Sequence, residues 1–262
     1  MKTRIISGLV MVPLLSIVYF GKLPLTIGCM IISLIGVKEF FTMYESKGIK
    51  PSKYLAYIMI LILYALHVSI GFKPYIFMAW IFISIAMSLI YGLDIVNRGP
   101  DDSIATMAGL MYLGFFPYHI VLLDGTVHRL MIWMIFIAAF GSDIFAYFIG
   151  CSFGKHKMAP NLSPKKSIEG AIGGIAGAGI LGLIFGMIFL RSLWYHCLIV
   201  GLIGGVISEC GDLVASSFKR QMGIKDYGNL IPGHGGIMDR FDSVIFVAPV
   251  VYYYVIFAVL HI

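Results

Sequence analysis

The chain has 262 residues, of which 60% are hydrophobic and 12% are charged, and its mean hydropathy is +0.94. This composition is too apolar and too poor in charge for a water-soluble globule of this size, so it predicts a polytopic membrane protein. The net charge of +6 comes mostly from the segments between apolar runs, which argues against nucleic-acid binding. The four cysteines form no close pair, which argues against a disulfide framework or a thiolate metal site.

Nine apolar runs approach or exceed the length that a helix needs to cross a bilayer, which is about 20 residues. In chain order they are Ile5 to Phe20, Leu23 to Tyr44, Tyr54 to Phe72, Pro74 to Leu93, Ser103 to Leu123, Leu130 to Gly150, Ile168 to Leu190, Leu193 to Ser217 and Ser243 to Ile262. No small-residue cleavage site follows the first run, so we expect a retained helix there. The predicted fold class is therefore all-α, a polytopic integral membrane protein with about nine transmembrane helices.

The basic residues predict an orientation, because cytoplasmic loops retain Lys and Arg. With the N-terminus inside, the outside loops hold only Lys22, Lys73, Arg129 and Arg191, and Lys38 lies within a span. All the other Lys and Arg residues fall in inside segments. The sequence thus predicts a cytoplasmic N-terminus, an outside C-terminus, and cytoplasmic loops at Cys151 to Ser167 and Lys219 to Asp242.

The chemistry concentrates in the C-terminal half. We expect residues 1–128 to be transmembrane helices for packing and a lipid groove, and residues 129–262 to be the catalytic region. Within the latter, "GAIGGIAGAGILGLIFG" holds Gly173 with Gly177 and Gly182 with Gly186, each pair on one helix face. Small residues at this spacing favour close helix packing, and a phosphate-cradling role is the weaker alternative.

Ionisable residues inside membrane spans are costly and therefore informative. Lys38 and Glu39 lie near the cytoplasmic end of their span, where we expect both to snorkel to the interface. Asp143 lies about two turns from the cytoplasmic end of its span, too deep for a short acid to snorkel, which favours a functional or inter-helix polar role.

A polar stripe follows one face of the eighth span. Glu209, Asp212, Ser216 and Lys219 recur at steps of three, four and three, which places them on one helical face. The stripe points to the cytoplasmic mouth of the helix. It is either part of a site or a buried ion-pair stripe between helices.

The loop after this span brings acids, cations and glycines together. Asp239 and Asp242 in "DRFD" begin the last helix, and Mg²⁺ prefers carboxylate ligands together with substrate phosphates. Asp212 and Asp239, from different helices, are the predicted metal ligands. Cations at Lys219, Arg220, Lys225 and Arg240 suit phosphate oxygens. The glycines of "PGHGG" would let backbone amides approach an anion.

Two further features suit phosphate binding, although each also fits a second role. His234 is either a pyrophosphate contact or proton donor, or a residue that fixes its loop by a hydrogen bond. The other loop ends in "SPKKS" at a helix N-terminus, where free amides and the helix dipole favour anions, so Lys165, Lys166 and Ser167 are candidate substrate ligands. The lysines of that loop could instead be topogenic or bind anionic lipid headgroups.

The C-terminal loop resembles the signature of the integral-membrane phosphatidate cytidylyltransferases, or CDP-diacylglycerol synthases. The matching residues are Ser216, Lys219, Arg220, Lys225, Asp226, Gly228, Pro232, His234, Gly235, Gly236, Asp239, Arg240 and Asp242. A second block, "SDIFAYFIGCSFGKHK" followed by "LSPKKSIEG", is similar to the family's upstream motif, so the resemblance covers Ser142 to Asp242. Departures are Ala215 for Glu, Glu209 for Gln, Ser167 for Thr and Tyr227 for a small residue, which leaves open how the carboxylates beside Asp212 are arranged.

The resemblance implies transfer of a cytidylyl group from CTP to phosphatidate, with Mg²⁺ as cofactor and a second cation left open. The implied catalytic residues are Asp212, Asp239, Lys219, Arg220 and His234. The implied substrate-binding residues are Asp143, Lys165, Lys166, Ser167, Ser216, Lys225, Asp226, Gly235, Gly236, Arg240 and Asp242. The implied setting is the plasma membrane with the active site facing the cytoplasm, and a homodimer is left open.

Two other functions are compatible with many helices and acidic loop motifs. A CTP-dependent polyprenol or dolichol kinase would transfer the γ-phosphate and release CDP instead of pyrophosphate. An ion-coupled transporter would use Asp143, Glu209 and Asp212 as an ion path, but the N-terminal half offers no charged counterpart to them.

Overall fold

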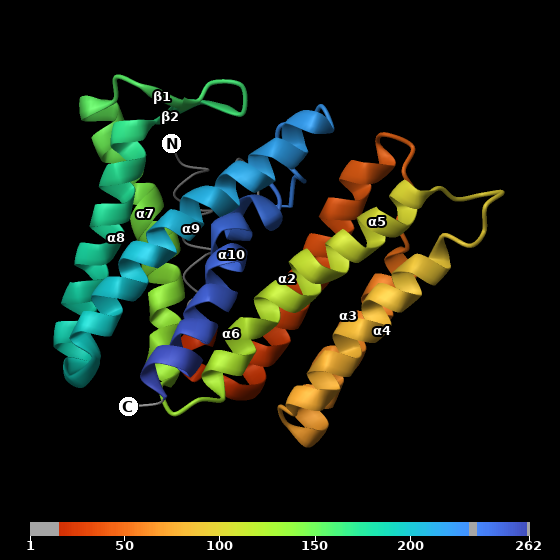
Figure 1. Ribbon diagram of the computed structural model, residues 1–262, viewed down its shortest axis with the longest axis horizontal. Helices are drawn as coiled ribbons and strands as arrows, with labels where there is room; N and C mark the ends of the chain where they lie inside the picture. Colours follow the sequence, from red (N-terminus) through yellow and green to blue (C-terminus); the bar gives the residue numbers. More distant parts are fainter. Residues whose placement is uncertain (1–15, 231–234, 261–262) are drawn as a thin grey trace. The chain divides into compact units, whose positions relative to one another are not determined.

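The computed structural model describes residues 16–230 and 235–260 as an almost wholly helical chain (Figure 1). Eight helical segments in these ranges are long and apolar enough to cross a membrane. They are Lys22–Glu45, Lys53–Ile70, Pro74–Tyr91, Pro100–Asp124, Arg129–Phe153, Ile168–Phe189, Arg191–Gln221 and Met238–Val259. They match the last eight predicted spans and confirm an all-α, polytopic membrane fold. The first predicted span, Ile5 to Phe20, lies outside the described residues except for residues 16–20, which are helical. The count of nine and the orientation stay predictions.

The described residues form two compact units. One comprises those of Met1–Gly125 and Gln221–Arg240, and the other comprises Thr126–Arg220 and those of Phe241–Ile262. The segment Gln221–Arg240, which carries much of the C-terminal motif, thus packs with the N-terminal helices. The predicted functional division after residue 128 stays a prediction.

The first unit contains α2 (Lys22–Glu45), α3 (Lys53–Ile70), α4 (Pro74–Tyr91), α5 (Pro100–Gly109) and α6 (Phe116–Asp124). A π-helical stretch, η1 (Leu110–Phe115), joins α5 to α6 without a break. Local sequence sets several ends: the Ser52 hydroxyl accepts a hydrogen bond from Leu55 N at 3.3 Å and caps α3, and Gly71, with φ of +71°, ends it. Phe40, Tyr64 and Leu113 are each at most 1% exposed and form part of the core.

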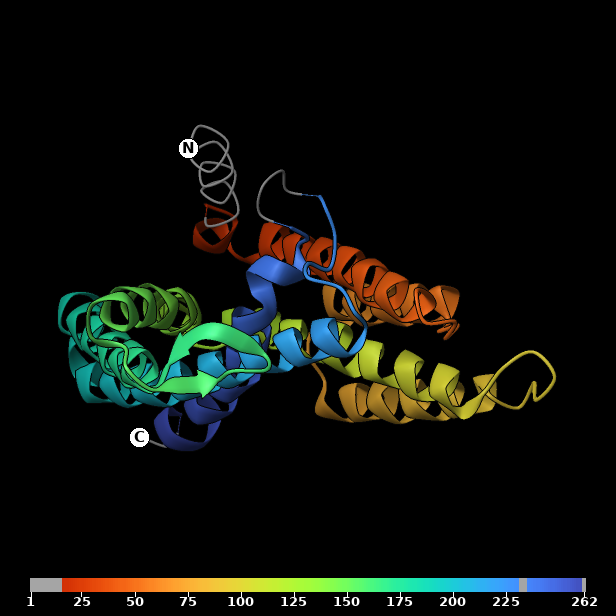
Figure 2. The same ribbon diagram turned by 90° about the horizontal axis from the view of Figure 1, so that it is seen from above.

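The second unit contains α7 (Ile132–Phe153), α8 (Ile168–Phe189), α9 (Trp194–Gln221) and most of α10 (Met238–Tyr254). Short 3₁₀ turns, η2 (Arg129–Met131) and η3 (Arg191–Leu193), precede α7 and α9, and a π-helical stretch, η4 (Val255–Val259), follows α10. Figures 1 and 2 show α7 and α8 side by side, with a β-hairpin at one end of the pair.

The glycines of α8 explain this close packing. A Cβ added at Gly173 or Gly177 would collide with Ile149 or Phe145 of α7, and one added at Gly182 or Gly186 would collide with Cys197 or Trp194 of α9. Each predicted glycine pair therefore lies against a different neighbouring helix. The packing interpretation of these pairs is confirmed.

Two boundaries differ from the predicted ones in ways that affect the site. Helix α9 continues through Lys219 and Arg220 to Gln221, because basic side chains are favourable at a helix C-terminus. Helix α10 begins at Met238, before the predicted span from Ser243, and Asp239 and Asp242 lie in its first turns as the motif predicted. Acids in the first turn of a helix are favoured by the same dipole.

The predicted loop Cys151 to Ser167 also contains regular structure. Its first residues complete α7, and the remainder forms an antiparallel hairpin of β1 (Lys157–Ala159) and β2 (Ser163–Ser167). Lys157 pairs with Ser167 and Ala159 with Ser163, with an irregularity between these pairs. The strands are short and lack apolar alternation, so the sequence offered no strand signal.

Candidate active site

The ammonium group of Lys166 joins two carboxylates of α9. Its Nζ lies 2.7 Å from Oε2 of Glu209 and 2.6 Å from Oδ2 of Asp212. The side chain of Glu209 is 7% exposed and that of Asp212 is 28% exposed, so water screens the second pair more than the first. Two residues of the predicted stripe on α9, Glu209 and Asp212, thus share one partner, which is a lysine of the hairpin.

The position of Lys166 follows from the way α8 begins. Ser167 is the N-cap of α8, and its hydroxyl accepts a hydrogen bond from Gly170 N at 3.1 Å. A Cβ on Gly150 would come within 3.2 Å of the Ser167 hydroxyl, which shows how closely α7 approaches this cap. Because the cap fixes the end of β2, the preceding residue is held beside α9.

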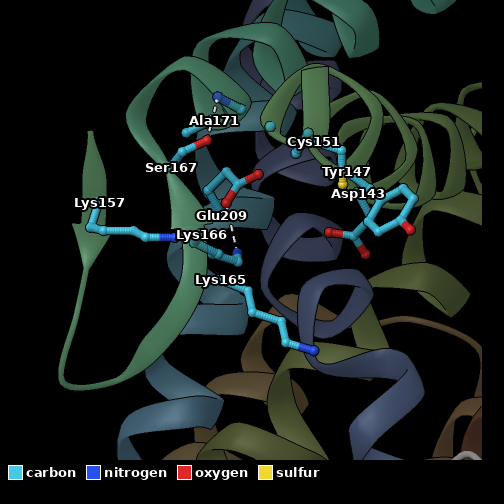
Figure 3. Close-up of a pocket in the computed structure, with 12 residues that line it drawn as sticks. Asp143, Tyr147, Cys151, Lys157, Lys165, Lys166, Ser167, Ala171 and Glu209 are labelled. Atoms are coloured by element: carbon cyan, nitrogen blue, oxygen red, sulfur yellow. Dashed lines mark hydrogen bonds and ion pairs between the residues drawn. The ribbon is translucent and has the colours of Figure 1, made fainter. Parts of the chain in front are cut away.

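A cavity of about 400 Å³ opens beside this ion cluster (Figure 3). Its charged lining consists of three lysines of the hairpin and two acids from the helices: Lys157, Lys165, Lys166, Asp143 and Glu209. Tyr147, Cys151 and Ser167 also line it, together with small residues of α7 and α8. This volume falls in the range of small-molecule sites in proteins, and three ammonium groups suit an anionic ligand.

The electrostatics of the cavity keep Lys166 charged. Burial lowers the pKa of its ammonium group, but the carboxylates of Asp212 and Glu209 raise it by more, so the pKa lies above the ordinary 10.5. Lys166 is therefore a permanent cation at neutral pH.

Asp143 of α7 lies on this cavity, as an acid with a polar role should (Figure 3). Its neighbour Ser142 is fully buried, and the Ser142 hydroxyl donates to Oε1 of Glu209 at 3.5 Å. Helix α7 thus contributes one acid to the wall and one hydroxyl to the ion cluster.

The last turn of α9 carries the remaining basic candidates of the second unit. Lys219 is only 9% exposed, while Arg220 is exposed and its Nε donates to the carbonyl of Leu162 in the hairpin at 3.4 Å. Ser216 is half-buried on the same helix. Asp242, 8% exposed on α10, accepts a hydrogen bond at Oδ1 from Ser243 N at 2.8 Å.

Asp239 organises a turn in the first unit. Its Oδ2 accepts hydrogen bonds from the backbone N–H of Tyr227 at 2.8 Å and of Gly236 at 2.9 Å. Gly235 has φ of +84°, a conformation that favours glycine. We predicted that the glycine turn offers amides to a phosphate, but the amide of Gly236 is bonded to Asp239.

The other candidates of this unit lie around the turn. Lys225 and Asp226 are exposed, and Arg240 is half-buried. Pro232 and His234 lie outside the described residues. Asp212 and Asp239 belong to different units, so their joint metal site stays a prediction.

One expectation about α2 is wrong. Lys38 is exposed, as snorkelling requires, but Glu39 is only 8% exposed. Its Oε1 accepts from Ile237 N at 3.0 Å and its Oε2 from Met238 N at 2.9 Å. The amides of Ile237 and Met238 have no acceptor within α10, because they lie at its N-terminal end. They therefore donate to the Glu39 carboxylate, which holds this side chain inside the protein.

Sequence reasoning missed three features of these arrangements, namely the backbone partners of Glu39, the place of Tyr147 on the cavity and the pairing of Glu209 with Lys166. Glu39 carried a signal, since an acid inside an apolar run needs a partner. The others depend on how the hairpin lies against the helices, which no local pattern predicts.

Comparison with known proteins agrees with the resemblance of the motifs. The sequence profile of the cytidylyltransferase family matches residues 2–258. A phosphatidate cytidylyltransferase of Bacillus subtilis is 34% identical over 97% of this chain and 97% of its own length. Proteins of the same name from Synechocystis and Staphylococcus aureus are 30% and 34% identical, and each covers at least 95% of this chain. With a family match over almost its whole length and near-complete coverage of these relatives, the chain belongs to the cytidylyltransferase family.

Proposed function

We propose that the protein transfers the cytidylyl group of CTP to phosphatidate, giving CDP-diacylglycerol and pyrophosphate for phospholipid synthesis. Near-complete alignment with relatives named for this activity supports the assignment. The structural observation that carries it is the cavity lined by three lysines, next to the ion cluster of Lys166, Glu209 and Asp212 and beside the ends of apolar helices. A lipid with a phosphate headgroup and a polyanionic nucleotide both suit such a place.

The reaction needs charge neutralisation more than a strong base. A phosphate monoester has a second pKa of about 6, so phosphatidate is already mostly dianionic at neutral pH. Its oxygen attacks the α-phosphorus of CTP, the bond from that phosphorus to the bridging oxygen breaks, and pyrophosphate leaves with the electron pair. Lys157, Lys165 and Lys166 bind and orient phosphate oxygens in this scheme, and positioning supplies most of the rate enhancement.

The residues fit a magnesium ion that shares its ligands with a substrate. In the ranges 16–230 and 235–260, no group of three His, Cys, Asp or Glu residues is arranged to hold a metal, but Mg²⁺ commonly uses one or two carboxylates plus substrate phosphates. Asp212, partly exposed and carrying two carboxylate oxygens, fits that mode. Asp212 and Asp239 would hold the ion, which supplies charge neutralisation at the phosphates when bound.

The proposal includes a setting. The active site faces the cytoplasm of a plasma-membrane protein, as the distribution of Lys and Arg predicts. Its substrates suit this setting, because CTP is water-soluble and phosphatidate lies in the bilayer.

Labelled CTP tests the proposal against its rivals. Purified protein in detergent is incubated with magnesium, with CTP labelled at either the α- or the γ-phosphate, and with either phosphatidate or a polyprenol as acceptor. Cytidylyl transfer places the α-label in lipid and the γ-label in pyrophosphate. Transfer of the γ-label to a lipid alcohol, with release of CDP, would indicate a kinase. Absence of any turnover, together with ion-driven transport in vesicles, would indicate a transporter.

A further inference from the structure

A carboxyl group inside α2 is bonded to the start of α10. Glu39 accepts hydrogen bonds from Ile237 N and Met238 N, at 3.0 Å and 2.9 Å, across about two hundred residues of sequence. Met238 is the first residue of the 17-residue helix α10 and Ile237 directly precedes it, where backbone N–H groups lack intrahelical partners. Glu39 therefore acts as an N-terminal cap of α10 that is supplied by a distant helix. Its negative charge also interacts favourably with the positive end of the α10 dipole.

Two motif glycines make room for this carboxyl group. A Cβ on Gly228 would lie 2.9 Å from Oε1 of Glu39, and a Cβ on Gly236 would collide with its carboxyl oxygens. No positive φ requires glycine at either position. The need for glycine at Gly228 and Gly236 thus comes from the approach of Glu39.

The same turn carries Asp239. Its Oδ2 accepts from Tyr227 N and Gly236 N, so the consecutive amides of Gly236, Ile237 and Met238 bond to Asp239 or Glu39. If Glu39 released Ile237 and Met238, the turn that orients Asp239 would lose two of its four carboxyl–amide bonds.

We propose that Glu39 is a positioning residue, which holds the turn from Gly235 to Asp239 so that the Asp239 carboxylate keeps the place needed for cytidylyl transfer. The inference rests on the proposed function, in which Asp239 holds magnesium with the CTP phosphates. Glu39 does not touch the reacting atoms in this scheme. It acts through the backbone of the turn.

The test compares Glu39→Gln and Glu39→Ala with Glu45→Gln, a control on the same helix whose carboxylate pairs with Lys53 at 2.6 Å instead. Hydrogen exchange of the backbone amides of residues 236–238 reports on the turn without any need for turnover. We expect exchange to be about 10- to 100-fold faster in Glu39→Ala, because hydrogen bonds to a charged group are lost. The change should be smaller in Glu39→Gln, whose side chain keeps one acceptor oxygen, and absent in Glu45→Gln.

Kinetics then separate positioning from simple stabilisation. In variants with a melting temperature close to that of the wild type, we expect a lower kcat and a higher magnesium concentration for half-maximal activity. Both effects should be larger in Glu39→Ala than in Glu39→Gln. KM for phosphatidate should stay unchanged. If only Glu39→Gln folds, it carries the test through the same readouts.

Three results would decide against parts of this account. Normal kcat and magnesium activation in a folded Glu39→Ala protein with faster exchange would overturn the positioning role and leave the proposed function intact. Unchanged exchange would overturn the cap itself. Absence of cytidylyl transfer by the wild type would overturn the proposed function, and the catalytic role of Glu39 with it, while exchange would still report on the cap.

Discussion

Nζ of Lys166 lies 2.6 Å from Oδ2 of Asp212, so a lysine predicted to hold phosphate is bonded to an acid predicted to hold a metal. Both groups also suit a bound Mg²⁺–CTP complex, since the cation would attract Asp212 and the phosphates would attract Lys166. The ion pair holds Lys166 and Asp212 beside each other in the absence of substrate. A bound Mg²⁺–CTP complex would offer phosphates to Lys166 and the cation to Asp212.

The acids of the C-terminal motif should differ in importance. Asp212→Asn and Asp239→Asn keep size and one oxygen but remove the charge that a hard cation requires, so activity should collapse while the protein still folds. Asp242→Asn should be milder, because that acid bonds to Ser243 N in its own helix. Magnesium-dependent turnover is measured in variants matched for expression and melting temperature. Near-normal activity of both Asp212→Asn and Asp239→Asn, with an unchanged magnesium requirement, would place the metal elsewhere.

Two lysines should affect substrate use more than folding. If each lysine binds a phosphate group as proposed, Lys166→Ala and Lys219→Ala would each remove a contact worth about 1.5–3 kcal/mol, which corresponds to about 10- to 100-fold in kcat/KM. Steady-state kinetics with CTP and with phosphatidate measure the effect, and Lys47→Ala, an exposed lysine at the end of α2, is the control. If both variants kept wild-type constants, neither lysine would have a part in substrate binding.

The orientation can be tested by chemical labelling. Cysteines introduced at the exposed positions Lys157 and Lys225 should react with an impermeant thiol reagent only after the membrane is opened, because both loops are predicted to be cytoplasmic. The native cysteines Cys151 and Cys210 are exposed and have to be replaced first. Ready labelling in intact cells would contradict the predicted orientation.

The contribution of Lys166 to stability should be lost in alkali. The pKa of Lys166 is raised in the folded protein, so its contribution to stability is fully present below the ordinary value of 10.5 and is lost as pH rises through the folded pKa. The difference in melting temperature between the wild type and Lys166→Met should stay constant from pH 7 to 9 and narrow above about pH 10.5. A difference that narrows already between pH 7 and 9 would show that Lys166 loses its proton there.

Sequence reasoning located the helices better than the contacts. Apolar length alone placed α2 to α10, because each span must satisfy its own backbone in lipid. The packing glycines of α8 and the neighbouring acids of α9 could also be predicted, because helical periodicity is visible in the local sequence. The partner of Glu209 did not emerge, because it lies on a hairpin whose position depends on tertiary packing. Glu39 was misread because its partners are backbone amides, which every residue except proline carries and no motif marks.

The hairpin holds Lys166 in place, and the length of its second strand also determines which residue faces α9. Successive residues of a strand face opposite sides, and β2 ends at the fixed cap of Ser167. Deleting Lys166 from β2 would place Lys165 directly before that cap, in the position that faces α9. The number of residues in β2, and not only its charge, therefore selects which lysine meets Glu209 and Asp212.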